Sequence, residues 1–187
     1  MAARPGMVSG EFSNMIVLPP NTRIQTATEA DLPELARLAG VIWRQYYPAI
    51  IVLAQIEYML ARMYSLETLV ADVRERGIRY ERLLVGDAFR GFAAFGPTEV
   101  PNRFKLHKLY LDPACHGQGL GSLLLAHCER EGVKLGASQM TLNVNKQNIR
   151  AIAAYQRNGY AITESVVVDI GGGFVMDDLV MGKVIVV

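Results

Sequence analysis

The chain has 187 residues, of which 51% are hydrophobic and 20% are charged, and its formal net charge is +1. This length and composition suit one globular domain with a sizeable core. The near-neutral charge argues against a general nucleic-acid-binding or membrane-binding surface, which would need an excess of basic residues. No apolar run reaches the roughly 18 residues that span a bilayer, and the N-terminus lacks the order of features of a signal peptide. We therefore expect a cytoplasmic protein that binds neither nucleic acid nor membrane.

The first 21 residues contain several prolines and glycines and show no lasting periodicity. They are predicted to form a flexible N-terminal tail (1–21), followed by a single domain at 22–187. The two cysteines, Cys115 and Cys128, match neither a zinc-binding spacing nor a disulfide framework. No metal is therefore expected.

Hydrophobic periodicity and turn residues predict the following elements in chain order. The first half contains a strand at 23–27, a helix that Thr28 caps and Pro48 ends, helices at 53–64 and 66–76, and strands at 80–85, 89–95 and 104–111. The second half contains a helix at 119–134, a strand at 140–144, a helix at 148–156, and strands at 160–168 and 175–187.

The loop between the strand at 104–111 and the next helix contains Gly117, Gly119 and Gly121. Glycine allows the backbone to approach a ligand closely and to adopt unusual dihedral angles. The first turn of a helix carries unpaired N–H groups and partial positive charge. Together these features predict a binding site for phosphate or pyrophosphate.

Three kinds of phosphate-binding loop are candidates for this stretch. A P-loop needs a lysine after its last glycine, whereas Gly121 is followed directly by Ser122. A dinucleotide-binding fold needs Gly-x-Gly-x-x-Gly within a parallel βαβ unit, whereas the spacing here is Gly-x-Gly-x-Gly. The stretch 116–121, His-Gly-Gln-Gly-Leu-Gly, instead resembles the first signature of the GNAT superfamily of acetyl-CoA-dependent N-acetyltransferases.

A second signature of that family, Asn-x-x-Ala-x-x-x-Tyr-x-x-x-Gly-Phe, matches Asn148, Ala151, Tyr155 and Gly159, with Tyr160 in place of Phe. Both signatures occur in the family's order and at its spacing. The resemblance implies an α/β (α+β) fold: a mixed, mostly antiparallel central sheet of about six to seven strands. This sheet would splay between its fourth and fifth strands and carry helices on both faces.

The resemblance also implies acetyl-CoA as cosubstrate. Backbone N–H groups of 117–121 would hold the pyrophosphate, and the strand end 109–111 would lie along the pantetheine arm. His116 replaces the usual Arg or Gln, which weakens any side-chain contact to the phosphates. The alternative is a plain strand-to-helix turn. The full predicted coenzyme-binding set is Leu109, Tyr110, Leu111, His116, Gly117, Gln118, Gly119, Leu120, Gly121, Ser122, Asn148 and Tyr155.

Tyr155 matches the family's usual general acid, which protonates the departing thiolate; alternatively it is a core tyrosine. Asn148 would contact the coenzyme, cap its own helix, or do both. Lys105 stands where some family members carry a glutamate base, so that base is missing. By strand alternation His107 lies on the same face as Lys105, unless a bulge redirects it. His107 is therefore the candidate base; alternatively it is a packing residue. The weaker candidates for the base are Glu57, Asp177 and Asp178.

Aromatic and methionine side chains are frequent in residues 43–64. These side chains either pack in the core or line a pocket for the acceptor. They are Trp43, Tyr46, Tyr47, Tyr58, Met59, Met63 and Tyr64. The predicted activity is acetyl transfer from acetyl-CoA to a primary amine of a small molecule, polyamine-like or amino-acid-like, by direct transfer in a ternary complex. The alternatives are a protein N-terminal or lysine acetyltransferase and a non-catalytic acyl-CoA-binding module. A homodimer is left open.

Overall fold

The computed structural model describes residues 18–186. Most of the expected tail, residues 1–17, lies outside the described residues. The helices are α1 (Leu32–Tyr46), α2 (Leu53–Met63), α3 (Leu66–Arg74), α4 (Leu120–Lys134) and α5 (Ile149–Arg157). The strands are β1 (Thr22–Thr26), β2 (Arg79–Val85), β3 (Ala88–Pro97), β4 (Arg103–Leu111), β5 (Gln139–Asn145), β6 (Ala161–Gly171) and β7 (Phe174–Val184).

The first helix begins later than its pattern predicts. Thr28 and Asp31 form a reciprocal capping box, but the turn that they close, Glu29–Asp31, is a 3₁₀ helix, and α1 starts at Leu32. A second 3₁₀ turn around Pro48 separates α1 from α2, because proline cannot supply the backbone N–H that a continuing helix needs. Elsewhere the observed elements match the predicted ones within about three residues.

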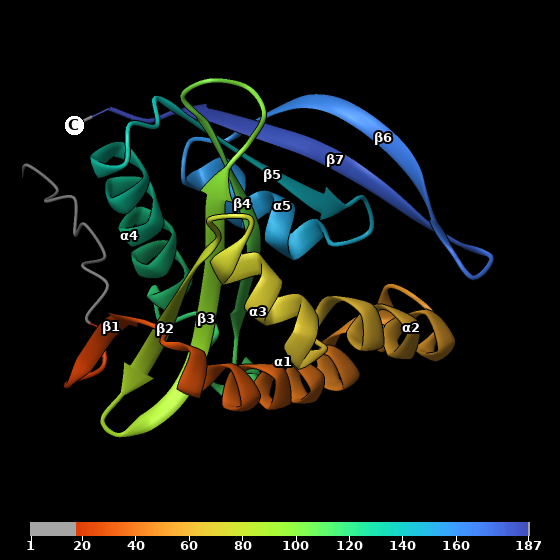
Figure 1. Cartoon of the computed structure of the whole chain (residues 1–187), viewed down its shortest axis with the longest axis horizontal. Helices are drawn as coiled ribbons and strands as arrows, with labels where there is room; N and C mark the ends of the chain where they lie inside the picture. Colours follow the sequence, from red (N-terminus) through yellow and green to blue (C-terminus); the bar gives the residue numbers. More distant parts are fainter. Residues whose placement is uncertain (1–17, 187) are drawn as a thin grey trace, which may run out of the picture.

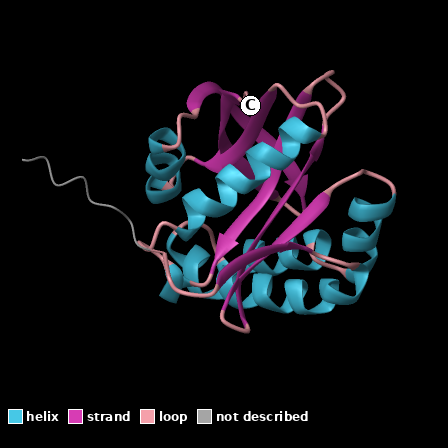
Figure 2. Ribbon diagram, turned by 90° about the vertical axis from the view of Figure 1, so that its left-hand side faces the viewer, coloured by secondary structure: helices cyan, strands magenta, loops and turns pink. Residues whose placement is uncertain are grey.

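The described strands form one seven-stranded sheet in the order β1-β2-β3-β4-β5-β7-β6. Every neighbouring pair is antiparallel except β4 and β5, which are parallel. This arrangement confirms the predicted mixed, mostly antiparallel sheet. Figure 2 shows the sheet between helices on both sides.

The parallel pair separates part-way along its length. β4 pairs with β5 only from Arg103 to Leu106, opposite 139–142. Beyond that point the strands diverge, and residues 108–111 pair only with β3. One edge of β4 therefore has backbone groups that no strand uses. A bulge lies at the same place: Ala94 pairs with Lys108 and Phe95 pairs with Leu106, so His107 is the extra residue.

Two hydrophobic clusters lie on opposite faces of the sheet. Figure 1 shows the helices that cover them, α4 and α5 apart from α1, α2 and α3. One contains the inward faces of α4 and α5, packed on β4, β5 and β7. The other contains α1, α2 and α3, packed on β2, β3 and the last part of β4. Both clusters border the place where β4 and β5 separate, so side chains pack against it from both faces. No helix in residues 18–186 is long and apolar enough to cross a bilayer.

Candidate active site

A cavity of about 350 Å³ opens where the glycine loop, the free edge of β4 and the start of α5 meet. This volume lies within the range of small-molecule sites. Most of the predicted coenzyme-binding residues line it. They are Leu109, Tyr110, Leu111, His116, Gly117, Gly119, Leu120, Gly121, Ser122, Asn148 and Tyr155. Gln118 does not line the cavity, and its amide donates instead to the carbonyl of Ala114 at 2.9 Å.

The glycine loop presents free backbone donors to this cavity. Gly117 and Gly119 have φ values of 79° and 75°, in the left-handed region that favours glycine. Gly119 is the N-cap of α4, and no side chain caps this end. Among the described residues, the N–H groups of 117–122 have no backbone partner. Together with the helix dipole, these donors can bind an anion.

Two arginines on α5, Arg150 and Arg157, also line the cavity. They were not predicted as site residues, although positions 150, 154 and 157 fall on one face of a helix. Burial lowers the pKa of His116 below its usual value, and the charge of Arg150 lowers it further. The imidazole is therefore neutral at pH 7, and the arginines carry the fixed positive charge of this end of the cavity.

Asn148 forms the predicted helix cap, and its contact with the coenzyme stays a prediction. Its side chain caps α5 by accepting from the N–H of Ala151 at 3.2 Å. The same oxygen accepts the hydroxyl of Tyr46 at 3.0 Å, which connects the end of α1 to the start of α5 across the cavity. The Tyr46 ring also lies edge-on to His116, with centroids 5.9 Å apart. Sequence reasoning found Tyr46 only as one of a crowded aromatic group.

Tyr155 lines the cavity from α5, and its ring packs edge-on to Tyr160 with centroids 5.9 Å apart. Its hydroxyl makes no hydrogen bond to any described residue. Burial raises the pKa of Tyr155 well above its usual value, and the nearby Cys128 thiol adds to the rise. The phenol therefore stays protonated at working pH and can donate to a ligand in the cavity.

His107 does not line this cavity. It is the extra residue of the β4 bulge, and its Nε2 atom is buried without a hydrogen-bond partner. Burial lowers the pKa of His107 to about 4, and the charges of Lys105 and Lys108 contribute. A neutral imidazole with this pKa accepts a proton from an ammonium group poorly. Its role as base stays a prediction.

The weaker candidates for the base differ sharply. Glu57 is bound by Arg44 through two contacts of 2.7 Å on the surface. Asp177 is paired with Lys146. Asp178 is 5% exposed, and its Oδ1 atom is buried without a partner. Burial raises the pKa of Asp178, whereas the hydrogen bond from Arg44 lowers the pKa of Glu57, so Asp178 is better suited to act as a base than Glu57.

The crowded aromatic segment divides between core and cavity. Trp43, Met59 and Tyr64 are buried in the cluster under α1–α3, as core residues would be. Tyr46 and Tyr47 line the cavity. The remaining two lie half-buried beside that cluster: Tyr58 and Met63. The Tyr58 hydroxyl donates to the carbonyl of Ile170 at 2.7 Å, which fixes the tip of the β6–β7 hairpin on α2.

Residues 43–160 match the family described as "Acetyltransferase (GNAT) family". The chain belongs to this family. It is therefore a GNAT-type N-acetyltransferase, and the two sequence signatures were interpreted correctly.

The chain is similar to several individual N-acetyltransferases. A spermidine N(1)-acetyltransferase of Thermoplasma acidophilum is 27% identical over 150 residues, which is 79% of this chain and 90% of that protein. The crystal structure of a PaiA N-acetyltransferase from Thermoplasma acidophilum in complex with coenzyme A superposes with a TM-score of 0.74 at 26% identity, covering 87% of this chain and 98% of that one. A peptidyl-lysine N-acetyltransferase of Salmonella typhimurium is 36% identical over 73 residues, only 38% of this chain and 47% of that protein.

Proposed function

We propose that this GNAT protein transfers an acetyl group from acetyl-CoA to a primary amine of a small molecule by direct transfer in a ternary complex. The observation that carries the proposal is the cavity itself, which joins unpaired backbone donors at the start of α4 to the hydroxyl of Tyr155. The acceptor is polyamine-like or amino-acid-like. A relative named as a spermidine N(1)-acetyltransferase supports this class of acceptor.

The residues present fit acetyl-CoA. The free N–H groups of 117–122 suit the pyrophosphate, and Arg150 and Arg157 add charge for the phosphates. The unpaired edge of β4 after Leu106 suits the amide groups of the pantetheine arm, which would bond to it as an added strand does. The thioester would then lie where β4 and β5 separate.

Tyr155 acts on the departing thiolate. A thiol of pKa about 8.5 is a stronger acid than a phenol of pKa about 10 or above. Because burial raises the pKa of Tyr155 further, complete proton transfer is uphill, and the hydroxyl contributes mainly as a hydrogen-bond donor to the developing negative charge. Positioning of the two substrates supplies much of the remaining rate enhancement.

Direct transfer is favoured over a covalent acyl-enzyme. Cys115 is the thiol that lines the cavity, and it is 7% exposed. Burial raises the pKa of this thiol, and the charge of Asp112 adds to the rise. The thiolate is the nucleophilic form, so Cys115 is poorly suited to accept the acetyl group. The amine nitrogen therefore attacks the thioester carbonyl itself.

The amine must be neutral before it attacks. His107 and Asp178 are the two proposed routes for its proton, and both approach the separation of β4 and β5 from the face of α1–α3. The raised pKa of Asp178 supports the carboxylate, whereas the depressed pKa of His107 weakens the imidazole. Variants of each residue assayed across pH distinguish the two, because loss of the true base removes the acidic limb of kcat/KM.

The experiment that tests the proposal incubates the protein with acetyl-CoA and each member of a panel of amines, and measures the release of free thiol. The panel holds amino acids, polyamines, simple alkylamines and short peptides with a free N-terminus or a lysine. We expect thiol release that depends on a small primary amine. If acetyl-CoA binds but no amine accelerates thiol release, the chain is a non-catalytic acyl-CoA-binding module; if only peptides do, it is a protein acetyltransferase.

A further inference from the structure

The side of the sheet opposite α4 and α5 is open next to the separation of β4 and β5. Phe104 and Leu106 pack into the cluster under α4, so Lys105 between them points to the opposite face. Across the neighbouring strand, Lys105 pairs with Gly96. A Cβ atom on Gly96 would lie 3.1 Å from the carbonyl oxygen of Gly77. The segment that follows α3 therefore lies directly beside Lys105.

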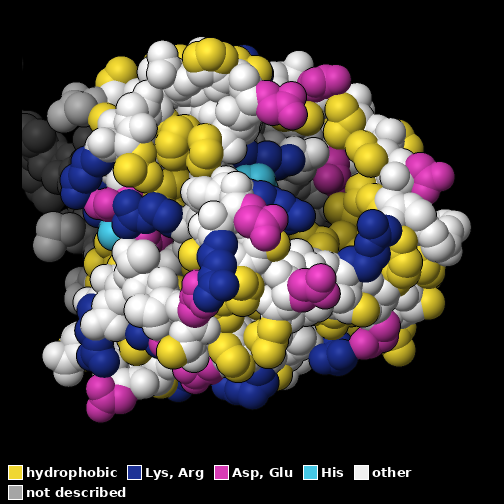
Figure 3. Space-filling view, in the orientation of Figure 1, with side chains coloured by type: hydrophobic (Ala, Val, Ile, Leu, Met, Phe, Trp, Pro, Cys, Tyr) yellow, Lys and Arg dark blue, Asp and Glu magenta, His cyan; other side chains and the backbone are white. Residues whose placement is uncertain are grey.

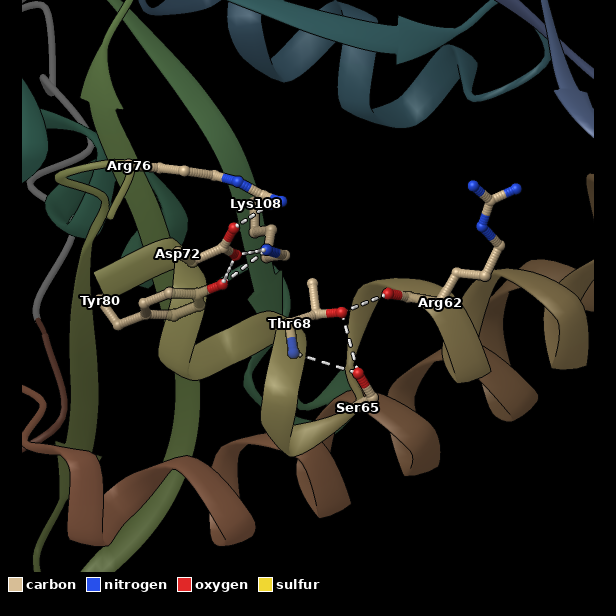
Figure 4. A network of polar contacts seen from close by, with 7 residues as sticks. All are labelled: Arg62, Ser65, Thr68, Asp72, Arg76, Tyr80 and Lys108. Atoms are coloured by element: carbon tan, nitrogen blue, oxygen red, sulfur yellow. Dashed lines mark hydrogen bonds and ion pairs between the residues drawn. The ribbon is translucent and has the colours of Figure 1, made fainter. Parts of the chain in front are cut away.

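That segment carries Arg76, whose side chain Figure 4 shows extended over Lys108. Arg76 binds one oxygen of Asp72 at 2.8 Å, and Lys108 binds the other at 2.9 Å. The Tyr80 hydroxyl also donates to Asp72. One carboxylate thus balances two cations, and the Arg76 side chain is still 59% exposed.

Lys105 adds a further cation, and no carboxylate among residues 18–186 lies within ion-pair distance of it. Burial lowers the pKa of Lys105, and the more distant charge of Asp178 partly opposes this effect. Burial lowers the pKa of the half-buried His107, and the positive charges of Lys105 and Lys108 lower it further. Both lysines therefore lie near His107. In the space-filling view, Lys, Arg and His side chains gather at a hollow near the centre of this face (Figure 3). The hollow therefore has an excess of positive charge at one side.

The opposite side of the same opening is acidic. Met176 packs in the cluster under α1–α3, so by alternation Asp178 on β7 faces the same side as Lys105. Asp178 pairs with Asn145, which lies on the part of β5 that has already diverged from β4. Its Oδ1 atom is buried and without a partner. Asn143, two residues before Asn145 on β5, is exposed.

We propose that the acceptor is a primary amine that also carries a carboxylate, and that Lys105 and Arg76 bind this carboxylate while the amine faces Asp178. This inference rests on the proposed function and narrows its acceptor. Unlike charges placed across the opening suit a zwitterion such as an amino acid. A polyamine would bring several positive charges next to Lys105 and Arg76, and Asp178 alone would have to balance them, because Asp72 is already paired with Arg76 and Lys108.

The test compares acceptors that differ only in the carboxylate: methionine with 3-(methylthio)propylamine, and phenylalanine with phenethylamine, with spermidine added. Thiol release is measured with saturating acetyl-CoA. We expect kcat/KM to be at least about tenfold higher for each amino acid than for its decarboxylated partner. Equal or greater activity on the partners or on spermidine overturns the proposal and leaves the acetyltransferase function standing. If none of these five amines accelerates thiol release, the amino-acid acceptor is also overturned, and the full amine panel decides whether the acetyltransferase function stands.

Lys105→Met removes the charge, keeps the chain length and breaks no ion pair. It is expected to lower the ratio of kcat/KM between each amino acid and its decarboxylated partner about tenfold. The charge of Lys105 also lowers the pKa values of His107 and Asp178, and the loss of that effect acts equally on both members of a pair. Lys134→Met is the matched control, because Lys134 is an exposed lysine on α4 that does not line the cavity. Equal effects of Lys105→Met on both members of a pair would show that Lys105 does not bind the carboxylate.

Discussion

Replacing Tyr155 with Phe tests the chemical role of the cavity, because it removes one oxygen atom and keeps the ring. The hydroxyl has no hydrogen-bond partner among the described residues, so its loss should cost less than the about 0.5–1.5 kcal/mol of a typical hydrogen bond. For a domain of this size that corresponds to a shift in Tm below about 6 °C. The ring keeps its packing against Tyr160.

The loss should appear in turnover. Stabilising a leaving thiolate lies at the lower end of acid–base contributions, about 10²-fold, which equals roughly 2.7 kcal/mol of transition-state stabilisation. Acetyl-CoA affinity should change little, because the phosphates are bound at the other end of the cavity. The assay measures kcat, acetyl-CoA affinity and Tm on one preparation, with an acceptor from the amine panel.

Tyr160→Phe is the matched control. Tyr160 is 3% exposed in the same hydrophobic cluster and does not line the cavity. It should keep nearly normal turnover. Unchanged kcat in a folded Tyr155→Phe protein would refute the reasoning and leave Tyr155 as a core residue; equal losses in both variants would point to packing.

Three further predictions concern the coenzyme end and the buried histidine. Gly119→Val should reduce acetyl-CoA affinity at least about tenfold, because a branched residue fits poorly at a φ of 75° and blocks the free N–H groups. Affinity is measured by calorimetry. Gly136→Val, with a φ of 94° at the far end of α4, is the control for backbone strain alone. His116→Arg should bind acetyl-CoA as well as or better than wild type, because arginine adds a fixed charge beside the phosphates; a large loss would assign His116 a specific contact. The pKa of His107 is about 4 in the folded protein and about 6.5 when exposed, so the unfolded state takes up a proton first as pH falls. The free energy of unfolding should therefore fall between pH 6.5 and pH 4 by up to about 3 kcal/mol more in wild type than in His107→Gln, measured by urea titration, and equal falls would contradict the buried neutral imidazole.

The fold and the glycine loop could be predicted because their signals are local. The β4–loop–α4 unit depends on a short apolar strand, glycines at positive φ and an amphipathic helix, all adjacent in the chain. Tyr155 was found because its spacing from Asn148 is fixed within one helix. The start of α1 was misplaced because a capping box marks a helical turn without stating whether it is α or 3₁₀.

What escaped prediction depends on contacts between distant segments. Tyr46 reaches Asn148 across 102 residues, and nothing near either residue signals the contact. Trp43 and Tyr46 lie three residues apart on α1, yet one is buried in the core and the other lines the cavity, because the sheet beneath α1 decides which face is covered. The basic opening around Lys105 likewise forms only when the segment after α3 packs on Gly96.

Direct passage of the acetyl group from acetyl-CoA to an amine in this cavity is tested most directly with acetyl-CoA that carries an isotopically labelled acetyl group. Mass spectrometry follows the label in the acceptor and in the intact protein. We predict label on the acceptor nitrogen in a one-to-one ratio with free thiol, and none on the protein at any time. Labelled protein that passes its acetyl group to the amine, at Cys115 or elsewhere, would contradict direct transfer.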